Sequence, residues 1–151
     1  MSKNKKICIV SSCGGHLTEI RMLLSIYSFY DYFYVLNDKA LLASDMKDKT
    51  YFITHSERDI KFFKNLWEAF QIIRKERPDV LMSTGAGPIV PFSLVGRFLF
   101  GIKTIYIETF TSIEKPTLTG KIMYWLADFF YYQWPDLKKY FPKGEYIGTL
   151  L

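Results

Sequence analysis

Two hydrophobic patterns alternate along this chain. Short runs rich in β-branched and aromatic residues are typical of strands and occupy residues 6–11, 32–36, 51–54, 80–82, 103–107, 129–133 and 145–148. Between them, apolar residues recur every three or four positions, as in helices, over residues 17–27, 59–76, 89–100, 121–127 and 136–140. Strands and helices in this order predict right-handed crossovers and an α/β fold. We expect a Rossmann-like, doubly wound parallel sheet in one domain over residues 1–151.

Two of the predicted helices carry large apolar surfaces. The helix over residues 59–76 has a single apolar stripe, which we expect to face the core: Ile60, Phe63, Trp67, Phe70 and Ile73. The helix over residues 89–100 is apolar all round and has Arg97 as its only charge. One interpretation is a buried central helix. The other is contact with a membrane or a partner, with Arg97 near lipid phosphate, through Phe92, Arg97, Phe98 and Phe100.

Composition narrows the class of protein. Apolar residues make up 49% and charged residues 23% of the 151 residues, which excludes a disordered or fibrous chain. Aromatic residues reach 18%, more than one small core easily hides, and therefore indicate a surface for a partner or a bilayer. The net charge of +5 is scattered along the chain, so it fits both an anionic partner and ordinary solubility.

The chain carries no sign of secretion or of a membrane span. Residues 1–6 lead directly into the first strand without a signal peptide. The longest uncharged run, residues 80–96, is interrupted by glycine and proline and is shorter than the roughly 20 apolar residues of a transmembrane helix. Cys8 and Cys13 form no CxxC motif, and a reduced, cytoplasmic compartment fits them best.

Three polar loops follow predicted strands, where parallel sheets bind their ligands. They cover residues 11–16, residues 83–88 and the pair Glu108 and Thr109. The first loop matches neither GxGxxG nor the Walker A pattern, which disfavours dinucleotide and P-loop NTPase functions. Its glycines allow backbone N–H groups to approach an anion, although a plain tight turn remains the alternative. The candidate residues for binding an acceptor or phosphate are Ser12, Gly14, Gly15, Ser83, Thr84, Gly85, Gly87 and Thr109.

Two side chains in these loops are candidates for acid–base chemistry. His16 stands at a helix start, where it serves as a base or phosphate ligand, or only caps the helix or faces solvent. Glu108 ends a buried strand, where its carboxylate must be exposed at the edge or paired. A nucleophilic pair of Cys13 and His16 lacks an orienting third group, and His55 is expected to be a surface residue. The histidines and cysteines never have metal-ligand spacing, so we expect no metal and no cofactor.

The loop sequences together resemble one family. Residues 11–16 (SSCGGH), 83–87 (STGAG) and 106–110 (YIETF) are similar to the landmarks of the acceptor-side subunit of split GT-B glycosyltransferases. These relatives include the anchor subunit of the dolichol-pathway N-acetylglucosaminyltransferase and bacterial PssD-type capsule and exopolysaccharide proteins. Residues 133–135 (QWP) and 146–148 (YIG) resemble the bacterial branch.

The resemblance implies the N-terminal half of a GT-B enzyme, which binds a lipid-diphosphate-linked saccharide acceptor and the membrane surface. A separate donor-binding subunit, the C-terminal half, would supply the UDP-sugar. Gly14, Gly15 and His16 would face the acceptor, with Glu108 beside them as an orienting group or base. The expected location is the inner face of the cell membrane, as a peripheral protein in capsule or exopolysaccharide synthesis.

Three other functions remain to be weighed. The chain could be a non-catalytic scaffold that only stabilises and localises its partner. It could be a stand-alone nucleotide-binding enzyme, which the missing fingerprints disfavour. Nucleic-acid binding is disfavoured because the sequence contains no basic–aromatic strip.

Overall fold

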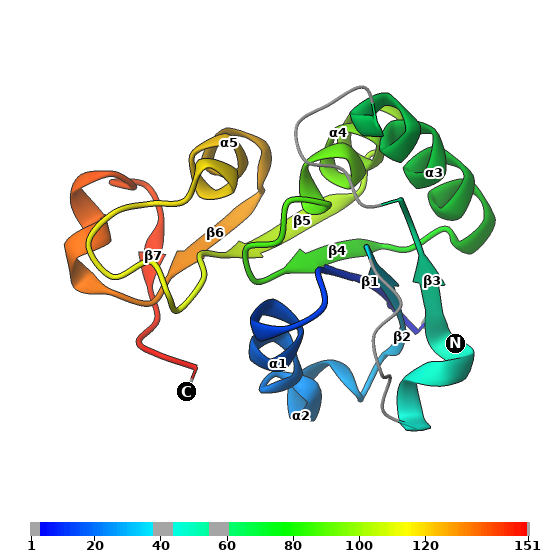
Figure 1. The fold of residues 1–151 in the computed structure, drawn as a ribbon, viewed down its shortest axis with the longest axis horizontal. Coiled ribbons are helices and arrows are strands. Elements are labelled where there is room, and N and C mark those ends of the chain that lie inside the picture. Colours follow the sequence, from blue (N-terminus) through cyan, green and yellow to red (C-terminus); the bar gives the residue numbers. More distant parts are fainter. Residues whose placement is uncertain (1–3, 38–43, 55–60, 151) are drawn as a thin grey trace.

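A parallel sheet with helices on both faces forms the molecule. The computed structural model describes residues 4–37, 44–54 and 61–150 (Figure 1). In this part of the chain, seven parallel strands lie in the order β3-β2-β1-β4-β5-β6-β7. Their bounds are β1 Lys6–Ser11, β2 Asp31–Leu36, β3 Thr50–Phe52, β4 Val80–Ser83, β5 Lys103–Ile107, β6 Phe129–Tyr132 and β7 Glu145–Tyr146. The predicted Rossmann-like, doubly wound α/β sheet is confirmed.

The helices form two layers around this sheet (Figure 1). One face carries α1 (Gly15–Arg21) and α2 (Leu24–Tyr27), which pack on a cluster that includes Ile9 and Tyr34. The other face carries α3 (Lys61–Glu76), α4 (Ile89–Phe100) and α5 (Leu118–Leu126) over a larger cluster centred on Phe92 and Tyr106. Two short 3-10 helices, η1 (Ser44–Lys49) and η2 (Pro135–Lys139), complete the elements.

The observed boundaries differ from the predicted ones at a few points. The helix expected over residues 17–27 is broken, because Met22 N and Leu23 N bond three residues back and close α1 with a tight turn before α2 begins. The sequence pattern did not predict η1. Residues 38–43 and 55–60 lie outside the described residues. The predictions for His55, for Ile60 and for a helix start at residue 59 therefore fall on residues that the structure does not describe.

The order of the strands fixes where a ligand site can form. β1 pairs with β2 on one side and with β4 on the other, so the direction of winding reverses between β1 and β4. A crevice opens outside the carboxyl ends of strands at such a switch point. The loops that follow β1, β4 and β5 all leave the sheet at this edge.

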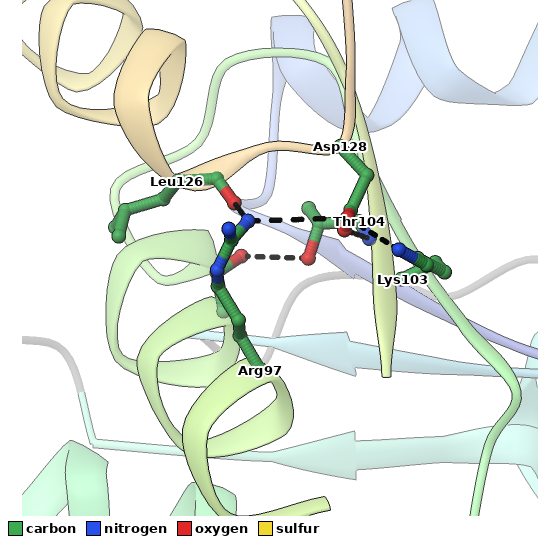
Figure 2. Close-up of polar contacts among 6 residues, drawn as sticks. Arg97, Lys103, Thr104, Leu126 and Asp128 are labelled. Carbon is green, nitrogen blue, oxygen red and sulfur yellow. Dashed lines mark hydrogen bonds and ion pairs between the residues drawn. The ribbon is translucent and has the colours of Figure 1, made fainter. Parts of the chain in front are cut away.

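Charged side chains connect α4 to β5 and to the segment between α5 and β6 (Figure 2). Asp128, just before β6, accepts bonds of 2.9 Å from Lys103 Nζ and from Thr104 N. Arg97 Nη1 donates to Leu126 O at 2.9 Å and lies 3.9 Å from the Asp128 carboxylate. Burial alone would raise the pKa of Asp128, but the bonds from Lys103 and Thr104 outweigh it and hold the pKa below its usual range.

Candidate active site

Two hydrogen bonds connect the loops after β1 and β4. The His16 ring Nδ1 lies 2.9 Å from Thr84 O, and Thr84 Oγ1 donates to His16 O at 3.0 Å. A carbonyl oxygen only accepts, so Nδ1 carries the hydrogen in this bond. In the neutral imidazole the lone pair is therefore on Nε2, the nitrogen that can act as a base.

At Gly85, in the loop after β4, the loop after β5 also comes close to the loop after β1. Its φ of +110° lies in the region that side-chain-bearing residues rarely adopt. A Cβ at this position would lie 3.0 Å from Thr109 Cβ and 3.1 Å from His16 Cε1. The structure thus brings His16, Gly85 and Thr109 together from three separate loops, and glycine at position 85 permits the close approach.

A pocket opens beside this junction. Its volume is about 370 Å³, within the range of small-molecule sites. It is lined by Gly15, His16, Thr18, Glu19, Thr109, Phe110 and Thr111. Three of the predicted site residues, Gly15, His16 and Thr109, are among them. Among the described residues, the ionisable side chains of this lining are His16 and Glu19, with no lysine or arginine.

Four residues of this pocket were not predicted from the sequence, namely Thr18, Glu19, Phe110 and Thr111, and Glu19 is the ionisable one among them. Its side chain is 4% exposed, and its carboxylate accepts bonds from Thr109 Oγ1 at 3.0 Å and Phe110 N at 2.7 Å. It also accepts a bond from Gln133 Nε2. A signal existed, because Glu19 follows His16 by three positions in a helix and so shares its face.

The remaining predicted loop residues lie in different environments. Gly14 precedes α1 with a φ of 100°, and no side chain caps this helix end. A Cβ on Gly14 or Gly15 would meet open space, while Ser12 is half-buried. Ser83 is fully buried, and its Oγ has no hydrogen-bond partner among the described residues. Gly87 is exposed and does not line the pocket.

Glu108 does not face the glycine loops as the resemblance implied. Its side chain is fully buried and is absent from the pocket lining. Side chains alternate along a strand, so Glu108 follows Tyr106 onto the sheet face covered by α3, α4 and α5. There its carboxylate accepts bonds from Thr117 N at 3.1 Å and Tyr106 Oη at 3.3 Å. From the sequence we expected this carboxylate to be either exposed or paired, and in the structure it is paired through these hydrogen bonds.

This arrangement holds the start of α5. Thr117 is the N-cap, and its Oγ1 accepts a bond from Gly120 N at 2.8 Å. In many helices the N–H of the N-cap residue donates to the side chain of a glutamate three residues later. Here the Thr117 N–H donates instead to Glu108, which follows β5. A Cβ on Gly120 would lie 1.6 Å from Glu108 Oε2, so the helix approaches the carboxylate as only glycine allows. Burial raises the pKa of Glu108, and the bonds from Thr117 reduce this rise without cancelling it.

The predicted contact surface on α4 is partly wrong. Phe92 is fully buried in the core beneath α4, because it lies on the helix face that packs on the sheet. Phe100 is half-buried against Phe70, with ring centroids 5.8 Å apart. Phe98 is 70% exposed, and Arg97 is bonded to Leu126 O and paired with Asp128 (Figure 2). Of the four residues, Phe98 alone presents a free apolar side chain to solvent.

The stripe on α3 is not wholly core either. Phe63 is 71% and Trp67 60% exposed, contrary to the sequence-based expectation. Together with α4 they form an apolar groove of about 590 Å³, lined by Phe63, Leu66, Trp67, Phe70, Leu94, Val95 and Leu99. Within the described residues, no helix combines the length and the apolar character needed to cross a membrane.

Comparison with known proteins identifies the family. A family profile described as "Oligosaccharide biosynthesis protein Alg14 like" matches residues 53–150, more than half of the chain. The chain belongs to the Alg14 family. This Alg14-family chain is 28% identical to the human UDP-N-acetylglucosamine transferase subunit ALG14, over 96% of its own length and 82% of the human protein. The Schizosaccharomyces pombe protein of the same description is 37% identical over 56% of this chain and 40% of that protein.

Solved structures show the same fold. Acinetobacter baumannii MurG matches 97% of the Alg14-family chain with a TM-score of 0.79 and 16% identity, over 46% of the MurG chain. A UDP-GlcNAc 2-epimerase from Methanocaldococcus jannaschii, solved with UDP-GlcNAc and UDP, matches 91% of the chain with a TM-score of 0.67 and 14% identity, over 43% of its length. The chain thus spans less than half of either structure. The predicted likeness to the dolichol-pathway subunit family is confirmed, while the likeness to PssD-type proteins stays a prediction.

Proposed function

We propose that this chain is the acceptor-binding subunit of a two-chain UDP-N-acetylglucosamine transferase. It would bind a lipid-diphosphate-linked saccharide, and a donor-binding partner would supply the nucleotide sugar. The observation that carries the proposal is the pocket in which His16, Glu19 and Thr109 meet at the carboxyl edge of the sheet. The names of the relatives, each a transferase subunit, support the division into two chains.

In the proposed reaction, an acceptor hydroxyl attacks the anomeric carbon of the donor sugar. The new glycosidic C–O bond forms while the bond from that carbon to the UDP oxygen breaks, and UDP leaves with the electron pair. His16 Nε2 takes the proton of the attacking hydroxyl, because Nδ1 is already held by Thr84 O. Positive charge or N–H groups of the partner would stabilise the departing diphosphate.

The geometry favours His16 over Glu108 as the base. His16 lines the pocket, whereas the Glu108 carboxylate is fully buried against Thr117 and Tyr106. We assign Glu108 the supporting role of holding α5 and the preceding loop, which begins with Thr109. The diphosphate would lie near Gly14 and Gly15, where the first turn of α1 has no side-chain cap.

We further propose that the outer face of α3, α4 and α5 rests on an anionic bilayer at the cytoplasmic side of the membrane. Its exposed apolar side chains are Phe63, Trp67, Phe98, Leu99, Leu118, Ile122 and Trp125. Arg74 continues the α3 stripe, and Lys121 stands beside Ile122 on α5. The acidic residues of these three helices are Glu68 and Glu76, and both accept bonds from the region of β3. Aromatic side chains with unopposed basic ones suit an anionic interface.

Vesicle flotation tests the membrane contact. Double substitution of Phe63 and Trp67 by serine should reduce binding to vesicles containing anionic phosphatidylglycerol at least fivefold. Phe29→Ser is the matched control, because Phe29 is 81% exposed but follows α2 on the opposite layer. Equal binding of the two variants would contradict the proposed surface. The role in bacterial capsule or exopolysaccharide synthesis stays a prediction.

Reconstituted transfer tests the proposed reaction. UDP-N-acetylglucosamine and membranes with lipid-linked acceptor are offered to this chain, to a donor-binding partner subunit, and to both. Activity that requires both chains supports the proposal. Full activity of the partner alone reduces this chain to a scaffold.

The His16→Asn variant then tests the base. Asparagine keeps a donor near the position of Nδ1 for Thr84 O but removes Nε2. We expect kcat of the complex to fall at least tenfold, a barrier change of about 1.4 kcal/mol, with unchanged assembly. Normal turnover by this variant would refute the assignment of His16.

A further inference from the structure

The lining of the 370 Å³ pocket selects a particular part of the acceptor. Besides His16 and Glu19 it offers three threonines and Phe110, and the described residues contribute no lysine or arginine to it. A buried carboxylate repels phosphate oxygens, whereas it accepts hydrogen bonds from hydroxyl groups. Threonine hydroxyls and an aromatic ring likewise suit a sugar, which has a polar rim and apolar C–H faces.

The bonds of Glu19 leave room for one more donor. Oε1 accepts bonds from Phe110 N and Gln133 Nε2, whereas Oε2 accepts one bond among the described residues, from Thr109 Oγ1. Each carboxylate oxygen can accept two bonds. Because Glu19 lines the pocket, the open position on Oε2 is available to a ligand there.

A second carboxylate has the same donors without the pocket. Glu68 on α3 accepts bonds from Thr54 N at 3.1 Å, Thr54 Oγ1 at 2.8 Å and Asn65 Nδ2 at 2.9 Å. Like Glu19, it therefore receives a backbone N–H, a threonine hydroxyl and a side-chain amide. Glu68 binds the segment after β3 and lines a separate pocket of about 350 Å³, and it is absent from the lining of the pocket that contains His16. It therefore provides a matched control for the structural role of such a carboxylate.

We propose that Glu19 is a specificity-determining residue whose carboxylate accepts a hydrogen bond from a sugar hydroxyl of the acceptor. The pocket then binds the neutral saccharide and excludes the diphosphate attached to it. The inference rests on the proposed function, of which it specifies the substrate group. The sugar would lie against Phe110 with its attacking hydroxyl toward His16. The diphosphate would remain outside, on the side of Gly14.

Equilibrium binding to the complex of this chain with its partner tests the proposal without requiring transfer. The probe is N-acetylglucosaminyl diphosphate on a short saturated prenyl chain, with single-deoxy versions of its sugar and inorganic pyrophosphate as further probes. Glu19→Gln keeps the side-chain volume and should weaken binding of the parent probe at least tenfold. Glu68→Gln should change it less than twofold.

The deoxy probes separate recognition from folding, because they are measured on the wild-type protein. One of them should bind the wild type at least tenfold more weakly than the parent probe does. The same deoxy probe should bind Glu19→Gln as tightly as it binds the wild type, because the hydroxyl that Glu19 recognises is already missing. Binding of pyrophosphate should change less than twofold on Glu19→Gln, because the position proposed for the diphosphate lies outside the pocket, on the side of Gly14.

The proposal is overturned if the wild type binds no parent probe, if every deoxy probe binds like the parent, or if Glu19→Gln binds normally. Pyrophosphate binding that changes more than twofold on Glu19→Gln would also overturn it, since the pocket would then hold the diphosphate. A complex that binds the probe through Glu19 but transfers no sugar would contradict the proposed function and leave this inference standing.

Discussion

Substitution of Gly120 by alanine would test the contact between α5 and Glu108. The added Cβ would lie 1.6 Å from Glu108 Oε2 and 2.6 Å from its Cδ. Contacts of a Cβ below 3.0 Å are essentially never observed, so the carboxylate must move by more than 1 Å. The side chain is fully buried and is held by bonds from Thr117 N and Tyr106 Oη.

The cost follows from what this movement breaks. Overpacking of a well-filled site costs about 1–3 kcal/mol. Displacement also deprives Thr117 N and Tyr106 Oη of their acceptor, and a buried donor without a partner costs about 1–3 kcal/mol. Alanine regains up to about 1 kcal/mol of helix propensity. We therefore expect Gly120→Ala to lower the free energy of unfolding by about 2–4 kcal/mol.

Urea unfolding of a double-mutant cycle is the appropriate assay. In a Glu108→Ala background the carboxylate is gone, so Gly120→Ala should cost less than about 0.5 kcal/mol, which corresponds to a coupling of about 2 kcal/mol. Gly87→Ala serves as control, because a Cβ on Gly87 meets nothing within 4 Å. An equal cost of Gly120→Ala in both backgrounds would refute the reasoning.

Three further predictions concern the site and its electrostatics. Gly85→Ala should cost about 1–3 kcal/mol in urea unfolding, because alanine is strained at a φ of +110° and its Cβ would crowd His16. The folded protein holds the Glu108 proton more tightly than the unfolded chain, so this group's contribution to stability falls as pH rises from its ordinary pKa through the raised one. Glu108→Gln should therefore gain stability relative to wild type as the pH rises above 4.5, and a difference independent of pH would contradict this. The pH dependence of the stability contributed by Glu76 is the opposite. Burial would raise the pKa of Glu76, but the bonds from Lys6 and Tyr51 outweigh it and lower the pKa. The stabilisation is therefore present at neutral pH and is lost on acidification. Glu76→Gln should cost about 1 kcal/mol at pH 7 and progressively less as the pH falls below 4.5, as measured by thermal unfolding at each pH.

Local patterns predicted most elements of this fold. The helix over residues 89–100 has the predicted bounds because its apolar run ends at Gly101, which adopts the left-handed conformation typical of a helix C-terminus. The strand over residues 103–107 is likewise as predicted. Such elements are specified by neighbouring residues and need no tertiary information.

The errors concern facts that local patterns do not contain. An amphipathic stripe shows which side of α3 is apolar but not whether another element covers it, and Phe63 and Trp67 remain exposed. Glu19 is buried by Phe110 and Gln133, which are 91 and 114 positions away in the sequence. The side on which Glu108 lies was within reach, since strand alternation from Tyr106 already places it away from α1.

The pair of bonds between His16 and Thr84 has a consequence for the proposed role of His16 as a base. An imidazole that gains a proton at Nε2 still donates from Nδ1, so uptake and release of a proton leave its bond to Thr84 O in place. The second bond, from Thr84 Oγ1 to His16 O, holds the backbone beneath the ring and does not depend on the charge of the ring. In the proposed reaction, Nε2 would therefore gain and lose a proton while the fold keeps its orientation fixed, and reorienting the ring would add nothing to the reaction barrier.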